Sequence, residues 1–176
     1  MSFSDLASVG SFISGITVVI TLIFLLLQMR QANLNQRALM QQMRSARTID
    51  TILRESDPYF SETLCLAYQN NPKMEEHQIL SFVQAMEATL FNWEDSFLQL
   101  KGGTLDASSF ESDDNALRSA ASNPAFRVAW RMNNGFYSKG FREYVDRIMH
   151  ETKVVQPPTY KSAWTAMMAQ ELSAAA

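Results

Sequence analysis

Two glutamates and two arginines are the residues whose types and spacing could carry chemistry in this chain. Glu87 and Glu94 lie seven residues apart and Arg127 and Arg131 lie four apart, so each pair would share one face of a helix. Carboxylates and guanidinium groups that meet in this way could be catalytic, but buried pairs of this kind are more often structural. We therefore expect structural ion pairs here, with an unrecognised enzyme site around the same four residues as the alternative.

Metal and nucleotide sites have little support in the sequence. Cys65, His77 and His150 have no second ligand at CxxC, HExxH or ExxH spacing, and there is no phosphate-binding glycine loop and no G-x-S-x-G motif. We expect no metal, no cofactor, no catalytic residue and no enzymatic activity. The net charge of −3, without a dense basic patch, also disfavours nucleic acid as a partner.

The strongest pattern in the chain is an uncharged apolar run over residues 6–29, LASVGSFISGITVVITLIFLLLQM. As a helix it would be about 36 Å long, which is enough to cross a hydrocarbon core of about 30 Å. The residues before the run lack Lys and Arg and no cleavage site follows it, so a permanent anchor is favoured over a signal peptide. The next four charges are all basic, which places the N-terminus outside and the rest in the cytoplasm.

Two patterns along this N-terminal region favour association between helices. The first is a row of small residues at intervals of four, which lets helix backbones approach closely in lipid: Ala7, Ser11 and Gly15. The second is an apolar seam at intervals of seven, joined by a methionine three residues before its third member: Ala32, Leu39, Met43, Ala46 and Leu53. No Gly or Pro interrupts residues 28–54, so the membrane helix should continue into a cytoplasmic stalk. A lone anchor with a permissive outer half is the alternative.

The basic residues of the stalk are Arg30, Arg37, Arg44 and Arg47. The first three recur every seven residues and face away from the apolar seam. On a continuous helix Arg44 and Arg47 lie more than about 20 Å beyond the end of the span, so lipid headgroups account only for Arg30 and Arg37. The other two should be solvated, paired with the acidic part of the chain, or lining a central opening of an oligomeric pore.

The remainder of the chain has the signals of an all-α bundle of about five short helices. Pro and Asn punctuate it, and the predicted helices cover 58–69, about 79–101, about 106–122, 124–133 and a fifth helix around Phe141 to Ile148. The second of these has an unbroken apolar seam: Ile79, Val83, Met86, Leu90, Trp93, Phe97 and Leu100. The expected organisation is a span over 1–29, a stalk over 30–55, a helical head over 56–152 and a hinged C-terminal segment over 153–176.

The C-terminal segment follows Pro157-Pro158 and has one more amphipathic stretch. Its candidate docking residues are Tyr160, Trp164 and Met168. Only Lys161 is basic within this stretch, so we expect it to pack on the bundle or on a neighbouring chain and not on the membrane surface.

Most of residues 18–149 resembles a widespread family of uncharacterised bacterial single-pass membrane proteins with a cytoplasmic all-helical domain. The resemblance lies in IFLLLQMRQANLNQRALMQQ, FNWEDSFLQLKGGTLD, NPAFRVAW and FREYVDRIM. Its most specific positions are Phe91, Trp93, Glu94, Gly103, Pro124, Trp130 and Phe141. The resemblance implies the layout and the bacterial inner membrane as the location, and it carries no activity with it.

In layout only, the chain is also similar to a membrane-anchored CRISPR accessory protein that forms a ring-shaped pore and has a head similar to HEPN nucleases. The HEPN site is an Arg followed, after four to six residues, by a His. The positions that would need the Arg hold Glu143, Tyr144 and Val145 before His150, and Asn70, Asn71 and Pro72 before His77. RNA cleavage by that chemistry is not expected.

The function that these patterns favour is assembly: a homo-oligomer or an accessory subunit of a membrane complex, with the helical head as the interaction surface. A homo-oligomeric membrane pore, such as a stress or defence effector, is the first alternative. An enzyme with an unrecognised site in the head is the second.

Overall fold

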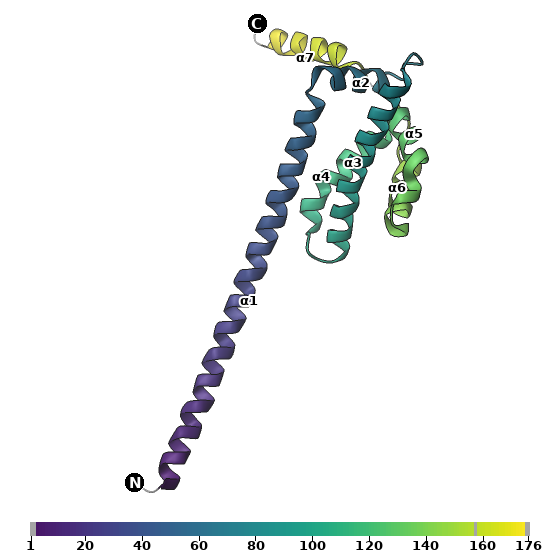
Figure 1. The fold of residues 1–176 in the computed structure, drawn as a ribbon. Coiled ribbons are helices and arrows are strands. Elements are labelled where there is room, and N and C mark those ends of the chain that lie inside the picture. The colour runs from purple at the N-terminus through teal and green to yellow at the C-terminus, as the bar shows by residue number, and fades with distance from the viewer. Residues whose placement is uncertain (1–2, 157, 175–176) are drawn as a thin grey trace. The chain divides into compact units, whose positions relative to one another are not determined.

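The structure is a computed structural model that describes residues 3–156 and 158–174, with the side chains of residues 4–7 and 9 left out. Within that part of the chain every regular element is a helix, which confirms the all-α fold class. The elements are α1 (Phe3–Glu55), α2 (Pro58–Tyr68), α3 (Glu76–Lys101), α4 (Ala107–Ala121), α5 (Pro124–Asn133), the short 3-10 helix η1 (Asn134–Phe136), α6 (Lys139–Glu151) and α7 (Tyr160–Ala174) (Figure 1).

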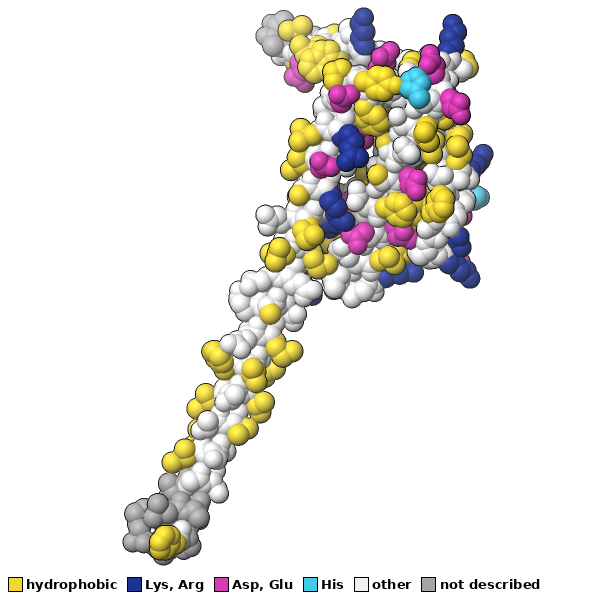
Figure 2. Space-filling model, viewed as in Figure 1, with side chains coloured by type: hydrophobic (Ala, Val, Ile, Leu, Met, Phe, Trp, Pro, Cys, Tyr) yellow, Lys and Arg dark blue, Asp and Glu magenta, His cyan; other side chains and the backbone are white. Residues whose placement is uncertain are grey.

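Helix α1 has the continuity that the sequence predicts. Among the described residues, one stretch within Gly10–Glu55 is long and apolar enough to cross a membrane, and its apolar window has no buried residue. Figure 2 shows hydrophobic side chains along the visible face of this stretch. Its threonines bond within the helix, since Thr17 Oγ1 donates to the carbonyl of Ile13 (2.9 Å) and Thr21 Oγ1 to that of Thr17 (2.8 Å).

The chain divides into two compact units, Met1–Ala46 and Arg47–Ala176. The division falls inside α1, so the last two turns of that helix, residues 47–55, group with the head. In these turns the partly buried residues are Arg47, Thr51 and Glu55, while Ile49, Ile52 and Leu53 are exposed. The polar side of the helix end therefore lies against the head, and its apolar side remains uncovered.

Helices α2, α4 and α5 of the head are capped by the side chain of the residue that precedes each of them. Asp57 accepts hydrogen bonds from the amides of Tyr59 and Phe60, and Asn123 accepts one from Ala125. A proline stands at the first position of both helices, where its missing N–H costs no hydrogen bond. Asp106 likewise caps α4 through the amide of Ser109. The starts of α2, α4 and α5 are thus those the sequence predicts.

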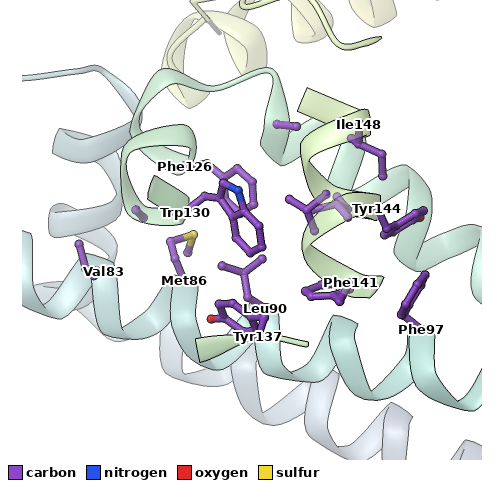
Figure 3. Close-up of a cluster of buried hydrophobic side chains, with 14 of the residues drawn as sticks. Val83, Met86, Leu90, Phe97, Phe126, Trp130, Tyr137, Phe141, Tyr144 and Ile148 are labelled. Atoms are coloured by element: carbon purple, nitrogen blue, oxygen red, sulfur yellow. The ribbon is translucent and has the colours of Figure 1, made fainter. Parts of the chain in front are cut away.

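The core of the head forms where α3 packs on α2, α4 and α5, and α4 packs on α5 and α6. Figure 3 shows the side chains of Leu90, Trp130 and Phe141 pointing toward one another in this core. Leu90, Phe126 and Phe141 are fully buried, and the Trp130 ring stacks on Tyr137 at 5.3 Å between centroids. Trp130 also satisfies its indole N–H on Asp146 Oδ1 at 2.8 Å.

The α3 seam differs from the prediction at its start. Val83, Met86, Leu90 and Phe97 are buried, but Ile79 is exposed. The bundle covers this helix from its second turn to its C-terminal end, where Leu100 packs against the core, so only the first member of the pattern is left exposed.

A polar network joins α4 to α6 at the rim of the core. Tyr144 donates its hydroxyl to Asp114, and Arg118 bonds Asp114 at 2.8 Å and Glu151 at 2.9 Å. Burial raises the pKa of Asp114, but the hydrogen bonds from Tyr144 and Arg118 outweigh that effect, so the net shift is downward. The ionised carboxylate is therefore the form that holds the two helices together.

Candidate functional site

The predicted pairing of Glu87 and Glu94 with Arg127 and Arg131 is wrong in its partners. Glu87 Oε2 accepts a hydrogen bond from Asn133 Nδ2 at 3.1 Å. Glu94 Oε1 accepts one from the amide of Ser138 at 2.7 Å. The two carboxylates of α3 thus bond the last residue of α5 and the residue that precedes α6. Ser138 is the N-cap of α6 and forms no cap bond with its own side chain, so Glu94 does the capping from another helix.

Arg127 bonds backbone instead of a carboxylate. Its Nε donates to the carbonyl of Ala121 at 2.6 Å, and its Nη2 donates to those of Met149 (2.8 Å) and Thr152 (2.6 Å). These carbonyls belong to the last turns of α4 and α6, where helix carbonyls lack partners in their own helix. Arg127 is therefore a clamp between two helix C-termini, a role for which a guanidinium has enough donors. Arg131 lies exposed on the last turn of α5.

The four arginines of the stalk differ in their surroundings. Arg30 and Arg37 are exposed, and Arg44 is partly buried. Arg47 donates from Nη2 to Asp95 Oδ2 of α3 at 2.8 Å, and Gln99 shares that oxygen at 2.9 Å. Arg47 is one of the two arginines predicted to lie too far from the lipid headgroups to contact them, and it pairs with an acidic residue of the head. About two fifths of each side chain in this ion pair is exposed, so its contribution to stability is modest.

The apolar seam of the stalk has no cover. Leu39 is 58% exposed, Met43 60% and Leu53 67%. Ala32 and Ala46 are exposed as well.

The small residues of the span leave a shallow hollow on the surface of α1. Ser11 and Gly15 form its floor, and Phe12, Ile16 and Val19 are among the larger side chains around it. A Cβ added at Gly15 would meet no atom within 4 Å. The side chain of Ala7 lies outside the described residues.

The predicted docking stripe of α7 stays on the surface. Tyr160 is 81% exposed and Trp164 69%, Met168 is exposed, and no described residue of α7 is buried. The bundle of its own chain, one of the two packing partners expected for this stripe, does not bury these side chains. A neighbouring chain as the partner stays a prediction.

A cavity in the head, which the sequence did not indicate, has a volume of about 520 Å³. Residues from the ends of α1, α2 and α4 line it together with the middle of α3 and the start of α7. Glu55, Tyr68 and Trp93 lie in its wall. Nothing in the local sequence marks these residues, because they come from five segments that only the fold brings together.

Two ionisable groups in this wall are perturbed by their surroundings. Burial raises the pKa of the Glu55 carboxyl, because the charged form loses solvation. Burial also raises the pKa of Tyr68 to about 12, and the nearby charges of Glu55 and Tyr160 add to this shift. Glu55 and the two tyrosines are therefore electrostatic neighbours.

Among the described residues no group of three His, Cys, Asp or Glu side chains is placed to hold a metal ion. Cys65 is a free and exposed thiol. Comparison of the chain with protein-family models, with curated proteins and with solved structures found no match.

Proposed function

We propose that this chain is a single-pass membrane protein that acts through assembly, with the span and the helix after it associating with other chains. The observation that carries the proposal is the uncovered apolar seam of α1. Leu39, Met43 and Leu53 repeat at heptad-compatible positions and each is more than half exposed. Exposed apolar residues in such a regular row are typical of a helix that packs against another helix.

The hollow over Ser11 and Gly15 supports the same proposal within the span. Helices in lipid associate through close backbone contact, and small residues at the surface of the helix permit it. The span and the seam are consecutive parts of one helix, so a single parallel partner helix could contact both.

We also propose that the N-terminus lies outside and the head in the cytoplasm of a bacterial inner membrane. The four arginines that follow the span, set against no Lys or Arg before it, support this orientation. The resemblance to a family of bacterial single-pass proteins supports the choice of membrane.

The proposal includes no enzymatic activity. Three of the four residues that first suggested chemistry form structural hydrogen bonds, which supports this part of the proposal. Glu87 and Glu94 bond residues at the two ends of the connection between α5 and α6, and Arg127 bonds two helix ends. Side chains with such hydrogen bonds stabilise the fold, and this role accounts for them without a catalytic one.

The proposal is tested by the mass of the full chain in mild detergent, measured by mass photometry after gentle crosslinking. We expect particles larger than one chain, and we expect Leu39→Asp and Ala32→Asp to shift them toward monomers, because a charge in the seam would be buried without a partner. Gln41→Asp is the matched control, since it adds the same charge about 160° around the helix from Leu39.

A monomeric wild-type particle without a co-purifying protein contradicts assembly altogether. Equal effects of Leu39→Asp and Gln41→Asp contradict the seam as the interface.

A further inference from the structure

The cavity of the head has the size of a small-molecule site. Its volume of about 520 Å³ falls within the range of about 300 to 1,000 Å³ that such sites occupy. Met86, Ala120 and Ala163 supply apolar wall, and Tyr68, Trp93 and Tyr160 supply aromatic rings. A ligand would therefore meet mostly carbon, with a few polar groups to orient it.

The charge of the wall has one sign. Glu55 is the acidic residue of the lining, and no Lys, Arg or His is among the described residues that line the cavity. Glu55 forms no ion pair with any described residue, unlike Asp95 or Asp114. A partly buried carboxylate without a counterion is costly, and a bound cation would remove that cost.

Backbone dipoles add to the negative character of the wall. The last turns of α1, α2 and α4 all reach the cavity, and a helix C-terminus carries a partial negative charge. Two helices begin there, and in each of them a capping side chain takes up one amide of the first turn: Asn123 accepts from Ala125, and Thr159 accepts from Ser162. Those two amides are therefore not available to an anion.

The hydroxyl groups of the wall point to the same conclusion. Thr51 donates to the carbonyl of Arg47 at 3.0 Å, Thr89 to that of Ala85 at 3.0 Å, and Ser122 to that of Ser119 at 2.6 Å. With their protons used inside their own segments, these oxygens offer lone pairs to a ligand. At these three positions the wall can accept a hydrogen bond from a ligand.

We propose that this cavity binds a small organic cation, an alkyl- or arylammonium ion, with its charged nitrogen near Glu55 and its carbon groups against Tyr68, Trp93 and Tyr160. Aromatic rings attract such ions through their negative faces, and a carboxylate among rings strengthens that attraction. The proposal goes beyond assembly and does not depend on it, because every residue that carries it belongs to one chain.

The test uses the full chain in maltoside detergent and isothermal titration calorimetry with choline as the probe. Its neutral carbon isostere, dimethylbutanol, has the same shape and hydroxyl but no charge. We expect choline to bind weakly, near a Kd of about 1 mM because it fills only part of the cavity, and at least about tenfold more tightly than the isostere. Equal binding of the two compounds, or no binding of choline at its highest soluble concentration, would overturn the proposal.

Two variants localise the binding. Glu55→Gln keeps the shape of the side chain but removes its charge, and we expect it to weaken choline binding about tenfold. Tyr160→Ala removes one ring from an exposed position of α7, and we expect it to weaken binding severalfold. Glu62→Gln, on the exposed side of α2, is the control and should leave the affinity unchanged. Unchanged affinity in Glu55→Gln, with an unchanged melting temperature, would overturn the site.

Discussion

At the scale of single residues, the polar groups of the head are used mainly to terminate and connect helices. Arg127 satisfies three carbonyl groups, and Glu94 satisfies the amide of Ser138, the N-cap of α6. Helix ends leave four unpaired backbone groups each, so a bundle of short helices has a large demand for such partners. Arg127 and Glu94 are ionisable residues that supply such partners.

Arg127→Met tests the clamp between α4 and α6. The methionine fills the space of the side-chain stem but leaves the carbonyls of Ala121, Met149 and Thr152 without their donor, and we expect the free energy of unfolding to fall by about 3 kcal/mol. The measurement is urea unfolding of the full chain followed by tryptophan fluorescence. Arg131→Met, at an exposed site on the same helix, should change it by less than about 1 kcal/mol. Similar losses in the two variants would contradict the clamp.

Asp106 gives the head a pH dependence in acid. Hydrogen bonds from Ser108 and Ser109 lower its pKa from 3.8 to about 2. A carboxyl whose pKa is lower in the folded state stabilises the fold above its unfolded pKa and loses that contribution as pH falls through the folded value. We expect urea unfolding to show stability falling between about pH 4 and pH 2. Asp106→Asn keeps a good N-cap without the titrating group, so its slope in this window should be shallower. Identical slopes would contradict this account.

The partners of these residues could not be predicted from their positions in the sequence. Glu87 and Glu94 were correctly placed on one helix, but their bonds go to Asn133 and Ser138 in a connection whose path depends on how α5 and α6 pack. Spacing along a helix determines which side chains share a face. It does not determine what lies opposite that face.

At the scale of elements, local signals were sufficient for most helix boundaries. Asp57-Pro58, Asp106 and Asn123-Pro124 act within two or three residues, so their effect is visible in the sequence alone. The start of α6 lacks such a signal, because the Ser138 side chain makes no cap bond and Glu94 of α3 supplies the acceptor.

Glu94→Ala tests this capping by a distant residue. It leaves the amide of Ser138 without its acceptor, and we expect a loss of about 1 to 2 kcal/mol in the free energy of unfolding together with faster hydrogen exchange at that amide. Glu111→Ala, at an exposed position of α4, is the control and should have little effect on either measurement. If the protein shows an enzymatic activity, and Glu94→Ala abolishes that activity without lowering the free energy of unfolding, the result would instead favour the enzyme alternative.

At the scale of the whole molecule, the two compact units meet different physical demands. Residues up to Ala46 have exposed apolar surface that suits lipid or another helix, whereas residues from Arg47 onward bury a core of their own. The sequence pattern alone predicted this contrast. It has an uncharged apolar run in the N-terminal part, followed by short amphipathic helices separated by Pro and Asn. The cavity could not be predicted in this way, because Glu55, Trp93 and Tyr160 lie far apart in the sequence.

Cys65 offers a test of orientation without a foreign tag. It is the one cysteine of the sequence and it is exposed, so a thiol reagent that cannot cross membranes should leave it unlabelled in spheroplasts and label it in inverted vesicles. The comparison variant combines Cys65→Ser with Phe3→Cys, at a position 97% exposed, and should show the opposite pattern. Labelling of Cys65 in intact spheroplasts would contradict a cytoplasmic head.

The internal hydrogen bonds of Thr17 and Thr21 bear on how the protein is made. Because both hydroxyls are satisfied by carbonyls of their own helix, neither threonine would expose an unbonded donor to lipid as the helix enters a bilayer. These two residues therefore need no partner at the insertion step, and in the assembly that we propose the subunits could meet afterwards by diffusing in the plane of the membrane. The abundance of the finished complex would be set by the concentration of inserted chains and not by their synthesis at one place.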